Sequence, residues 1–293
     1  MKKIKFLFLL ICLIFPLTAC AAKKSSPKTE RPKVAAVNFQ RKYKIKSTPT
    51  LFFHGALSNY KSETNITKTV QKTGMTNSVT RINVSPDGKV KFVGEIKKNA
   101  INPIVEVNYK NNIQLDFEKA GMYATNVVRA LKQKYDITQV NMVAHSLGNM
   151  SVMYYLLQNY NKKSMPRLNK QVAIAGHFNG VNFSQGPQDL RVPSNLKLYA
   201  NGKPNKMNKA YKQLLALRKI YPKEKTQVLN IVGNKSNGND GLVTNASSES
   251  LKYLLGSDVN NYQLRKFYGQ SAEHGRLTYN HQVIREIIQF LWG

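Results

Sequence analysis

The sequence predicts an α/β protein whose largely parallel sheet is covered by helices on both faces. Two observations carry this expectation. From Thr48 onward, short apolar runs typical of strands alternate with helical apolar spacing, as in chains built from βαβ units. At 293 residues and 42% hydrophobic composition, the chain can bury one large core, and a single domain over residues 48–293 is the default at this length.

Residues 1–19 are predicted to be an export signal. Basic residues in Met1–Lys5 precede the apolar run Phe6–Leu17, which is too short to cross a bilayer as an ordinary helix but has the length of a signal-peptide core. The run leads into Leu17-Thr18-Ala19-Cys20, which resembles the lipobox of bacterial lipoproteins. In those proteins the cysteine becomes the lipidated first residue, so Cys20 is the expected lipidation site. The alternative is an ordinary cleaved signal with a chance cysteine.

Residues 20–47 are expected to tether the domain to a membrane. The second cysteine, Cys12, lies in the apolar run, so the domain contains neither a disulfide nor a cysteine-based nucleophile or metal site. Between Ala21 and Lys46, nine Lys or Arg residues face Glu30 alone, and such a basic run is attracted to anionic lipid by about 1 kcal/mol per charge. We therefore predict an extracytoplasmic protein held at the cell membrane by a lipid anchor and a basic tether.

The rest of the chain is also basic, because the formal charge of +30 extends well beyond the signal and the tether. Such a surface favours acidic substrates or polyanionic envelope polymers, or it is only a solvated Lys-rich surface. Nucleic acid is not an expected partner, because the chain carries an export signal and lacks helix-turn-helix, zinc-finger and aromatic RNA-binding motifs. The sequence does not indicate an oligomeric state.

The domain begins with strand signals. Thr50–Phe53 is a short apolar strand. Val79–Val84 and Val90–Ile96 flank Ser85-Pro86-Asp87-Gly88, and the order of Pro, Asp and Gly there is that of a tight turn, so the two runs are predicted to pair as a hairpin. Ile104–Tyr109 is a further strand.

Two helices and a strand follow. Asn111 or Asn112 can cap a helix whose apolar residues recur at three- and four-residue spacing, namely Ile113, Phe117, Ala120, Ala124, Val127 and Leu131. Val140–Ala144 is an apolar strand, and Leu147–Asn161 is the helix after it.

The second half contains three strands, an excursion and a closing helix. After the strand Val172–Ala175, residues 179–222 form an excursion with one helical segment near Lys206–Ile220. That segment is either a lid or acyl-pocket wall, or a core-facing helix, and its spacing favours the latter. The last strands are Val228–Val232 and Tyr262–Phe267. The closing helix has an apolar face formed by Val283, Ile284, Ile287, Ile288 and Leu291.

Ser146 is the predicted nucleophile. The strand Val140–Ala144 runs directly toward it and a helix follows, which is the context of a nucleophile elbow. Small residues two before and two after the serine permit the sharp turn, although Ala144 stands where glycine is more frequent and Gly148 is the second small residue. The alternative is a serine that only caps the helix. His145 is expected to pack beside the site rather than to act as base.

Chain order predicts the base. Enzymes with such an elbow have the order nucleophile, acid, histidine. His274 follows the last strand and is therefore the expected general base. His281 lies about two helical turns further on and is the weaker candidate. His54 and His177 precede the acid, so structural or pocket-wall roles are expected for them.

Asp240 is the predicted acid, because it is the only carboxylate in the glycine-rich loop after Val228–Val232. The alternative is an aspartate that only stabilises a turn beside glycine. Asp258 is the second choice, and Asp189 is out of place in this order. Two backbone N–H groups are candidates for the oxyanion hole: that of Leu147, at a helix N-terminus, and that of Ala56, after His54-Gly55.

Six motifs together resemble one family, the lipase-like cell-surface α/β-hydrolases of Gram-positive bacteria, whose functions are largely unknown. They occur in the family's order within residues 48–293, as Phe52-Phe53-His54-Gly55, Pro86-Asp87-Gly88, Asn102-Pro103-Ile104, Ala144-His145-Ser146-Leu147-Gly148, Asn239-Asp240-Gly241-Leu242-Val243 and Ala272-Glu273-His274. The resemblance implies the α/β-hydrolase fold and carries the triad onto Ser146, Asp240 and His274. The sequence departs from the family pattern at Thr278, where relatives are expected to have a second histidine. The absence of that histidine here favours His274 as the base.

The expected activity is therefore esterase or lipase-like hydrolysis of a small-molecule or lipid ester through an acyl-enzyme, without a metal or an organic cofactor. Two alternatives stay open. The same triad could cleave an amide or transfer the acyl group to an envelope component. The chain could also be a catalytically silent lipoprotein that binds surfaces through its basic face.

Overall fold

The computed structural model describes residues 48–183, 187–257 and 259–293. The predicted signal peptide, Cys20 and the basic tether lie outside these residues, as does Asp258. Within the described ranges, no helix has both the length and the apolar character needed to cross a membrane.

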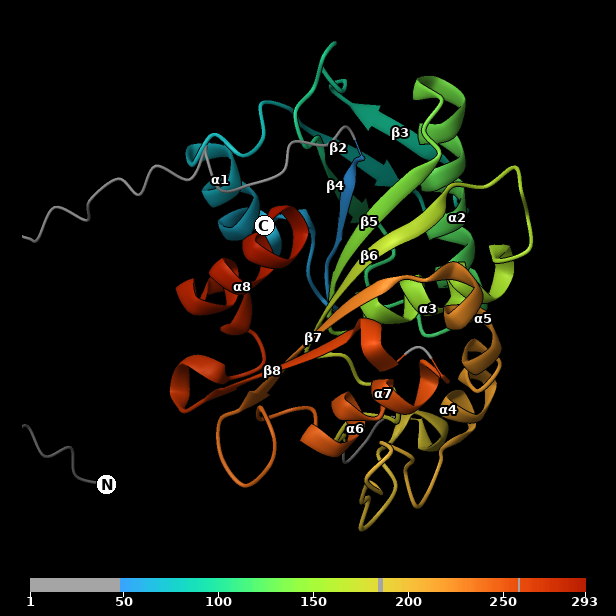
Figure 1. Cartoon of the computed structure of the whole chain (residues 1–293), viewed down its shortest axis with the longest axis vertical. Coiled ribbons are helices and arrows are strands. Elements are labelled where there is room, and N and C mark those ends of the chain that lie inside the picture. The colour runs from blue at the N-terminus through green and yellow to red at the C-terminus, as the bar shows by residue number, and fades with distance from the viewer. Residues whose placement is uncertain (1–47, 184–186, 258) are drawn as a thin grey trace, which may run out of the picture. The chain divides into compact units, whose positions relative to one another are not determined.

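The described part of the chain forms one eight-stranded sheet (Figure 1), in the order β3-β2-β4-β1-β5-β6-β7-β8. β2 and β3 pair antiparallel as the predicted hairpin, and every other neighbouring pair is parallel. This confirms the predicted α/β class. The strands are β1 (Thr50–Phe53), β2 (Val79–Val84), β3 (Val90–Val93), β4 (Ile104–Tyr109), β5 (Gln139–His145), β6 (Arg167–Ile174), β7 (Gln227–Asn234) and β8 (Tyr262–Tyr268).

Helices cover both faces of this sheet. Figure 1 shows α1 and α8 on one side and α2, α3 and α5 on the other, and the two hydrophobic clusters of the core follow the same division. The helices are α1 (Thr64–Lys72), α2 (Phe117–Tyr135), α3 (Gly148–Asn159), α4 (Lys209–Leu214), α5 (Leu217–Glu224), α6 (Asn245–Glu249), α7 (Leu251–Leu254) and α8 (His281–Trp292).

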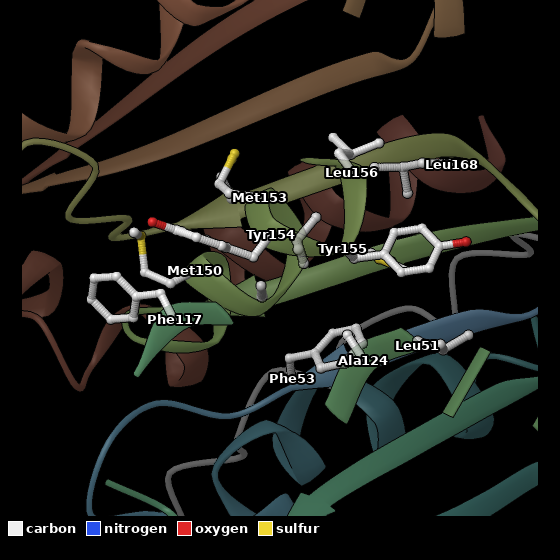
Figure 2. Packing of buried hydrophobic residues seen from close by; sticks show 14 of the residues in the cluster. Leu51, Phe53, Phe117, Ala124, Met150, Met153, Tyr154, Tyr155, Leu156 and Leu168 are labelled. Carbon is white, nitrogen blue, oxygen red and sulfur yellow. The ribbon is translucent and has the colours of Figure 1, made fainter. Parts of the chain in front are cut away.

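Strand β1 shows why the central strands read as continuous apolar runs. Leu51 and Phe53 belong to the cluster beneath α2 and α3, whereas Phe52 belongs to the cluster beneath α1 and α8. Side chains alternate between the faces of a strand, and both faces here are covered, so each position must be apolar. Figure 2 shows the first cluster from close by, with Leu51 and Phe53 beside side chains of α3.

Helix α2 begins later than predicted. Its first residue is Phe117, and its N-cap is Asp116, whose carboxylate accepts the N–H three residues on at 3.1 Å. Asn111 and Asn112 lie in the preceding loop, and Ile113 is 48% exposed rather than part of the apolar face. The prediction was wrong at this end because Asn stabilises turns as readily as it caps helices.

Several other predicted elements have different bounds, and two of them show the reasons. β3 ends at Val93 instead of Ile96, because Gly94 adopts a φ of +86° and turns the chain. The helical segment near Lys206–Ile220 is two helices, α4 and α5. Their buried side chains pack into the cluster beneath α2 and α3, which bears out a core-facing helix rather than a lid.

Candidate active site

The three predicted catalytic residues follow three parallel strands. Ser146 comes directly after β5, Asp240 lies in the loop after β7, and His274 lies in the loop after β8. The carboxyl ends of parallel strands meet at one edge of a sheet, which is where open α/β sheets bind ligands. Side chains that are 94 and 34 residues apart in sequence are thereby brought to one place.

The turn between β5 and α3 forces Ser146 into a left-handed conformation, with a φ of +50°. That conformation is uncommon for a residue with a side chain and is typical of strained functional sites. Its N–H donates to the carbonyl of Ile174 at 2.9 Å, which ties the turn to β6. A Cβ on Gly148 would lie 2.6 Å from the carbonyl oxygen of Phe53, so the close approach of α3 to β1 requires glycine there.

Asn149 holds the same turn from inside. Its side chain is fully buried, and its Nδ2 donates to the carbonyl oxygens of Ala144, Ser146 and Ile174 at 3.1, 3.1 and 3.2 Å. These bonds tie the start of α3 to the ends of β5 and β6. Sequence reasoning missed this residue, and a polar side chain three positions after the serine on a buried helix was the only signal.

A chain of two hydrogen bonds joins the three predicted residues. His274 Nε2 lies 2.9 Å from Ser146 Oγ, and His274 Nδ1 lies 2.8 Å from Asp240 Oδ2. The carboxylate can only accept, so Nδ1 carries the hydrogen and Nε2 presents a lone pair to the serine hydroxyl. All three side chains are buried, with Asp240 only 1% exposed. This arrangement can remove a proton from a serine hydroxyl and stabilise the resulting imidazolium.

Asp240 is fixed by its own loop. Its second oxygen, Oδ1, accepts from the N–H groups of Leu242 at 2.9 Å and Val243 at 2.7 Å. Its backbone carbonyl accepts the N–H of His274 at 2.8 Å, so main chain as well as side chain links the two loops. The turn-stabilising role that sequence reasoning left as an alternative is therefore present alongside the contact with His274.

The two predicted oxyanion donors lie on either side of the serine. Leu147 follows Ser146 at the start of α3, and Ala56 follows Gly55, where a Cβ would lie only 3.1 Å from the Cβ of Ser146. Among the described residues, neither the N–H of Ala56 nor that of Leu147 has a hydrogen-bond acceptor in the protein. Both are therefore available to a developing negative charge.

The space beside these donors is small. A pocket of about 10 Å³, close to the minimum for one water molecule, has Gly55 and Leu147 in its wall together with His54 and Tyr109. Neither this small pocket nor four larger hollows of the described surface, such as the one lined by Thr48 and Gln139, has a triad residue in its wall.

The remaining histidines are arranged as expected from chain order. His54 is buried, accepts the N–H of Tyr109 on Nε2 at 3.0 Å, and lines the small pocket. His177 is also buried, and burial together with the charge of His274 lowers its pKa to about 4. His281 begins α8 and is exposed.

His145 packs against the triad without contacting the hydroxyl of Ser146. Its Nε2 lies 3.0 Å from the backbone carbonyl of His274, and the two rings are 5.0 Å apart. Behind it lies Glu63, a buried acid at the end of the 3-10 turn η2 (Tyr60–Glu63). The sequence contained no signal for Glu63, because η2 and α1 were not predicted.

Two further residues named in the sequence analysis lie outside the triad. Asp189 pairs with Lys209 at 3.2 Å, and the hydroxyl of Thr278, which is buried, donates to the carbonyl of Gly275 at 3.3 Å.

Comparisons with known proteins agree with this fold. A family model described as "Alpha/beta hydrolase of unknown function (DUF915)" matches residues 38–293. None of the curated proteins compared with the chain matches it.

Solved structures with TM-scores above 0.5 share the fold. A gene product from Listeria innocua is 24% identical, with 84% of this chain and 94% of that chain covered and a TM-score of 0.72. A protein from Lactobacillus plantarum, provisionally named a cell surface hydrolase, is 16% identical, with coverages of 82% and 88% and a TM-score of 0.60. A lipase-esterase related protein from Clostridium acetobutylicum is 14% identical, with coverages of 85% and 98% and a TM-score of 0.47. At these identities the likeness concerns the fold alone.

Proposed function

The chain belongs to this family of α/β hydrolases, and from that premise we propose that it hydrolyses carboxylic esters through an acyl-enzyme on Ser146. The observation that carries the proposal is the chain of hydrogen bonds from Ser146 through His274 to Asp240, with lengths of 2.9 and 2.8 Å. A serine that only capped a helix would have no need of a buried imidazole and a buried carboxylate in line with it.

The reaction follows from the proton positions. His274 Nε2 takes the proton of Ser146 as Oγ attacks the ester carbonyl, and the N–H groups of Ala56 and Leu147 stabilise the oxyanion. The imidazolium then protonates the leaving alkoxide, which leaves an acyl-serine. A water molecule, deprotonated by the same imidazole, attacks the acyl-serine and releases the acid. Asp240 holds the Nδ1–H tautomer throughout by accepting that hydrogen.

We further propose that the enzyme acts outside the cytoplasm, anchored through lipidated Cys20 and the basic tether of residues 20–47. The apolar signal core, the lipobox-like Leu17-Thr18-Ala19-Cys20 and the excess of Lys and Arg support this location. The provisional name of the Lactobacillus relative, a cell surface hydrolase, is consistent with it.

Turnover of p-nitrophenyl esters of increasing acyl length tests the proposed activity. The wild type should hydrolyse the acetate and butyrate esters, and Ser146→Ala should lower kcat by up to about 10⁶-fold while the protein stays folded. Ester turnover that survives in Ser146→Ala would refute the proposal. Product analysis with added amine and alcohol acceptors separates hydrolysis from acyl transfer to an envelope component.

A further inference from the structure

Two buried titratable groups beside the triad have no part in the reaction described above. His145 directly precedes the nucleophile at the end of β5, and Glu63 ends η2. The Nδ1 of His145 lies 3.9 Å from Oε1 of Glu63, and both side chains are almost completely buried. The histidine contacts the triad on its other side, so the pair connects η2 with the loop of His274.

The contact with His274 fixes the hydrogen on His145. Its Nε2 lies 3.0 Å from the backbone carbonyl oxygen of His274, and a carbonyl can only accept. The Nε2 atom must therefore carry a hydrogen for this bond to exist. In a neutral imidazole the other nitrogen, Nδ1, then presents a lone pair, and this lone pair faces the carboxyl group of Glu63.

Glu63 is in an environment that favours its neutral form. Its Oε2 accepts from Ser62 Oγ at 2.5 Å, but its buried Oε1 has no hydrogen-bond partner among the described residues. Burial raises the pKa of Glu63 to about 8, and burial lowers the pKa of His145 to about 3. Near pH 7 the pair therefore holds two protons, one on the carboxyl and one on Nε2.

We propose that Glu63 and His145 are a positioning pair that holds the backbone of His274, and that the pair does so only while it retains both protons. The inference rests on the proposed role of His274 as general base. Neither residue touches the reacting atoms, so both act through the position of His274.

The effect of losing one proton follows from counting acceptors. When Glu63 ionises, its carboxylate faces Nδ1 and favours a hydrogen there, whereas the carbonyl of His274 requires the hydrogen on Nε2. One proton cannot serve both acceptors. The Nδ1–H tautomer turns the lone pair of Nε2 toward the carbonyl oxygen, and the bond that holds His274 is lost. The two groups titrate as a coupled pair, so the apparent pKa belongs to both.

Other charged groups act on the pair in identifiable ways. On the side of Glu63, the carboxylate of Glu106 on β4 raises the pKa further, and Glu106 is itself moderated by Arg81 on β2 and Lys68 on α1. On the side of His145, His274 and His54 oppose a positive charge, whereas Asp240 favours one. None of these neighbours donates a hydrogen bond to Oε1 of Glu63, and the ring nitrogen that this oxygen faces is Nδ1 of His145, at 3.9 Å.

The test is the pH dependence of the rate at which a fluorophosphonate modifies Ser146. In this step an Oγ–P bond forms, fluoride leaves, and the serine proton passes to His274, so the rate reports the base without acyl turnover. For the wild type we expect a rate that falls by about tenfold at alkaline pH, as the pair loses a proton. Glu63→Gln keeps a donor toward Nδ1 but cannot ionise, so its rate should not fall.

Three further variants complete the experiment. Glu63→Ala should react about tenfold more slowly at pH 7 and show no alkaline fall. His145→Gln keeps an amide donor for the carbonyl of His274 without a titrating ring, and should also lack the fall. Glu224→Gln is the matched control, because Glu224 is a buried acid on α5 whose pKa burial also raises, and its profile should equal that of the wild type.

The outcomes separate this inference from the proposed function. A labelled Ser146 with no alkaline fall in the wild type overturns the inference alone, as does a fall that persists in Glu63→Gln and His145→Gln. A wild-type Ser146 that is never labelled overturns both. Circular dichroism at each pH shows whether each variant is folded, so a loss of rate through unfolding is recognised.

Discussion

Each oxygen of the Asp240 carboxylate has a separate role. Oδ2 accepts from His274, while Oδ1 accepts from two backbone N–H groups of its own loop. The backbone bonds hold the carboxylate in place, and its Oδ2, as an acceptor, keeps the hydrogen of His274 on Nδ1. In the triad, the hydrogen bonds of Asp240 therefore leave one position for the ring hydrogen of His274, on Nδ1.

Replacing Asp240 by Asn should disturb the hydrogen bonds of the triad more than it disturbs the packing around residue 240. The amide keeps the shape of the side chain, but if its NH₂ faces His274 it favours hydrogen on Nε2, the wrong tautomer for accepting the serine proton. We expect kcat to fall by about 10⁴-fold, as when the orienting acid of other serine hydrolases is changed in this way. Steady-state ester turnover measures the loss. A variant with near-normal kcat would remove Asp240 from the catalytic assignment.

Glu63 should also change how stability depends on pH. Its pKa is raised to about 8 in the folded protein, above that of an exposed glutamate. Between about pH 4.5 and 8 the unfolded chain therefore binds fewer protons at this group than the native state does, so Glu63 makes stability fall as pH rises, by at most about 1.4 kcal/mol per pH unit.

In Glu63→Gln that contribution is absent. Urea unfolding at pH 5 and pH 8 should show that the variant loses less stability than the wild type over this interval. Equal losses in the two proteins would mean that Glu63 is not buried as a neutral acid.

Among the elements, those that carry the site were predictable because local chemistry constrains them. The elbow needs small residues around Ser146 and an apolar strand before it, and the hairpin needs Pro, Asp and Gly in one order. Both requirements are therefore visible in the sequence. The loop positions of Asp240 and His274 followed from chain order alone, and the structure brings both to Ser146.

Elements that depend on tertiary contacts were not predictable. Helix α1 has only Ile66, Thr67 and Val70 buried, too few for a visible apolar period, and α6 and α7 are five and four residues long. Strand β6 begins at Arg167, before its apolar part, because pairing with β5 rather than apolar content sets its length. Glu63 went unnoticed for the same reason, since its role exists only where η2 meets β5.

The start of α2 offers a direct measurement of an element boundary. Asp116 caps the helix in the structure, whereas the sequence favoured Asn111 or Asn112. Asp116→Ala should lower the free energy of unfolding by about 1 kcal/mol, because an N-cap acceptor is lost. Asn111→Ala should change it by less than about 0.5 kcal/mol, because Asn111 is a half-buried loop residue whose side chain accepts the N–H of Ile113 only at 3.4 Å. Chemical denaturation of both variants decides the boundary, and the reverse order of effects would place the cap in the loop.

The whole molecule combines a folded hydrolase domain with a strongly basic N-terminal stretch. The candidate site lies within residues 48–293, so we expect its chemistry not to require the preceding residues. The excess of Lys and Arg between Ala21 and Lys46 is expected to act on location instead, by attraction to anionic lipid.

Two truncated proteins separate these roles. Residues 21–293 should bind vesicles containing phosphatidylserine more tightly than residues 48–293, and the difference should shrink as salt screens the charges. Both should hydrolyse a soluble ester at the same rate. Vesicle co-sedimentation measures the binding, and equal binding by the two proteins at low salt would remove the proposed role of the tether.

The central claim is that the hydroxyl of Ser146 is activated by His274 under the control of Asp240. Mass spectrometry of the protein after reaction with a fluorophosphonate tests it most directly. The account predicts one adduct, on the peptide that contains Ser146, and no adduct on that peptide in His274→Ala over the same time. An unmodified Ser146 in the folded wild type, or equal modification with and without His274, would contradict the account.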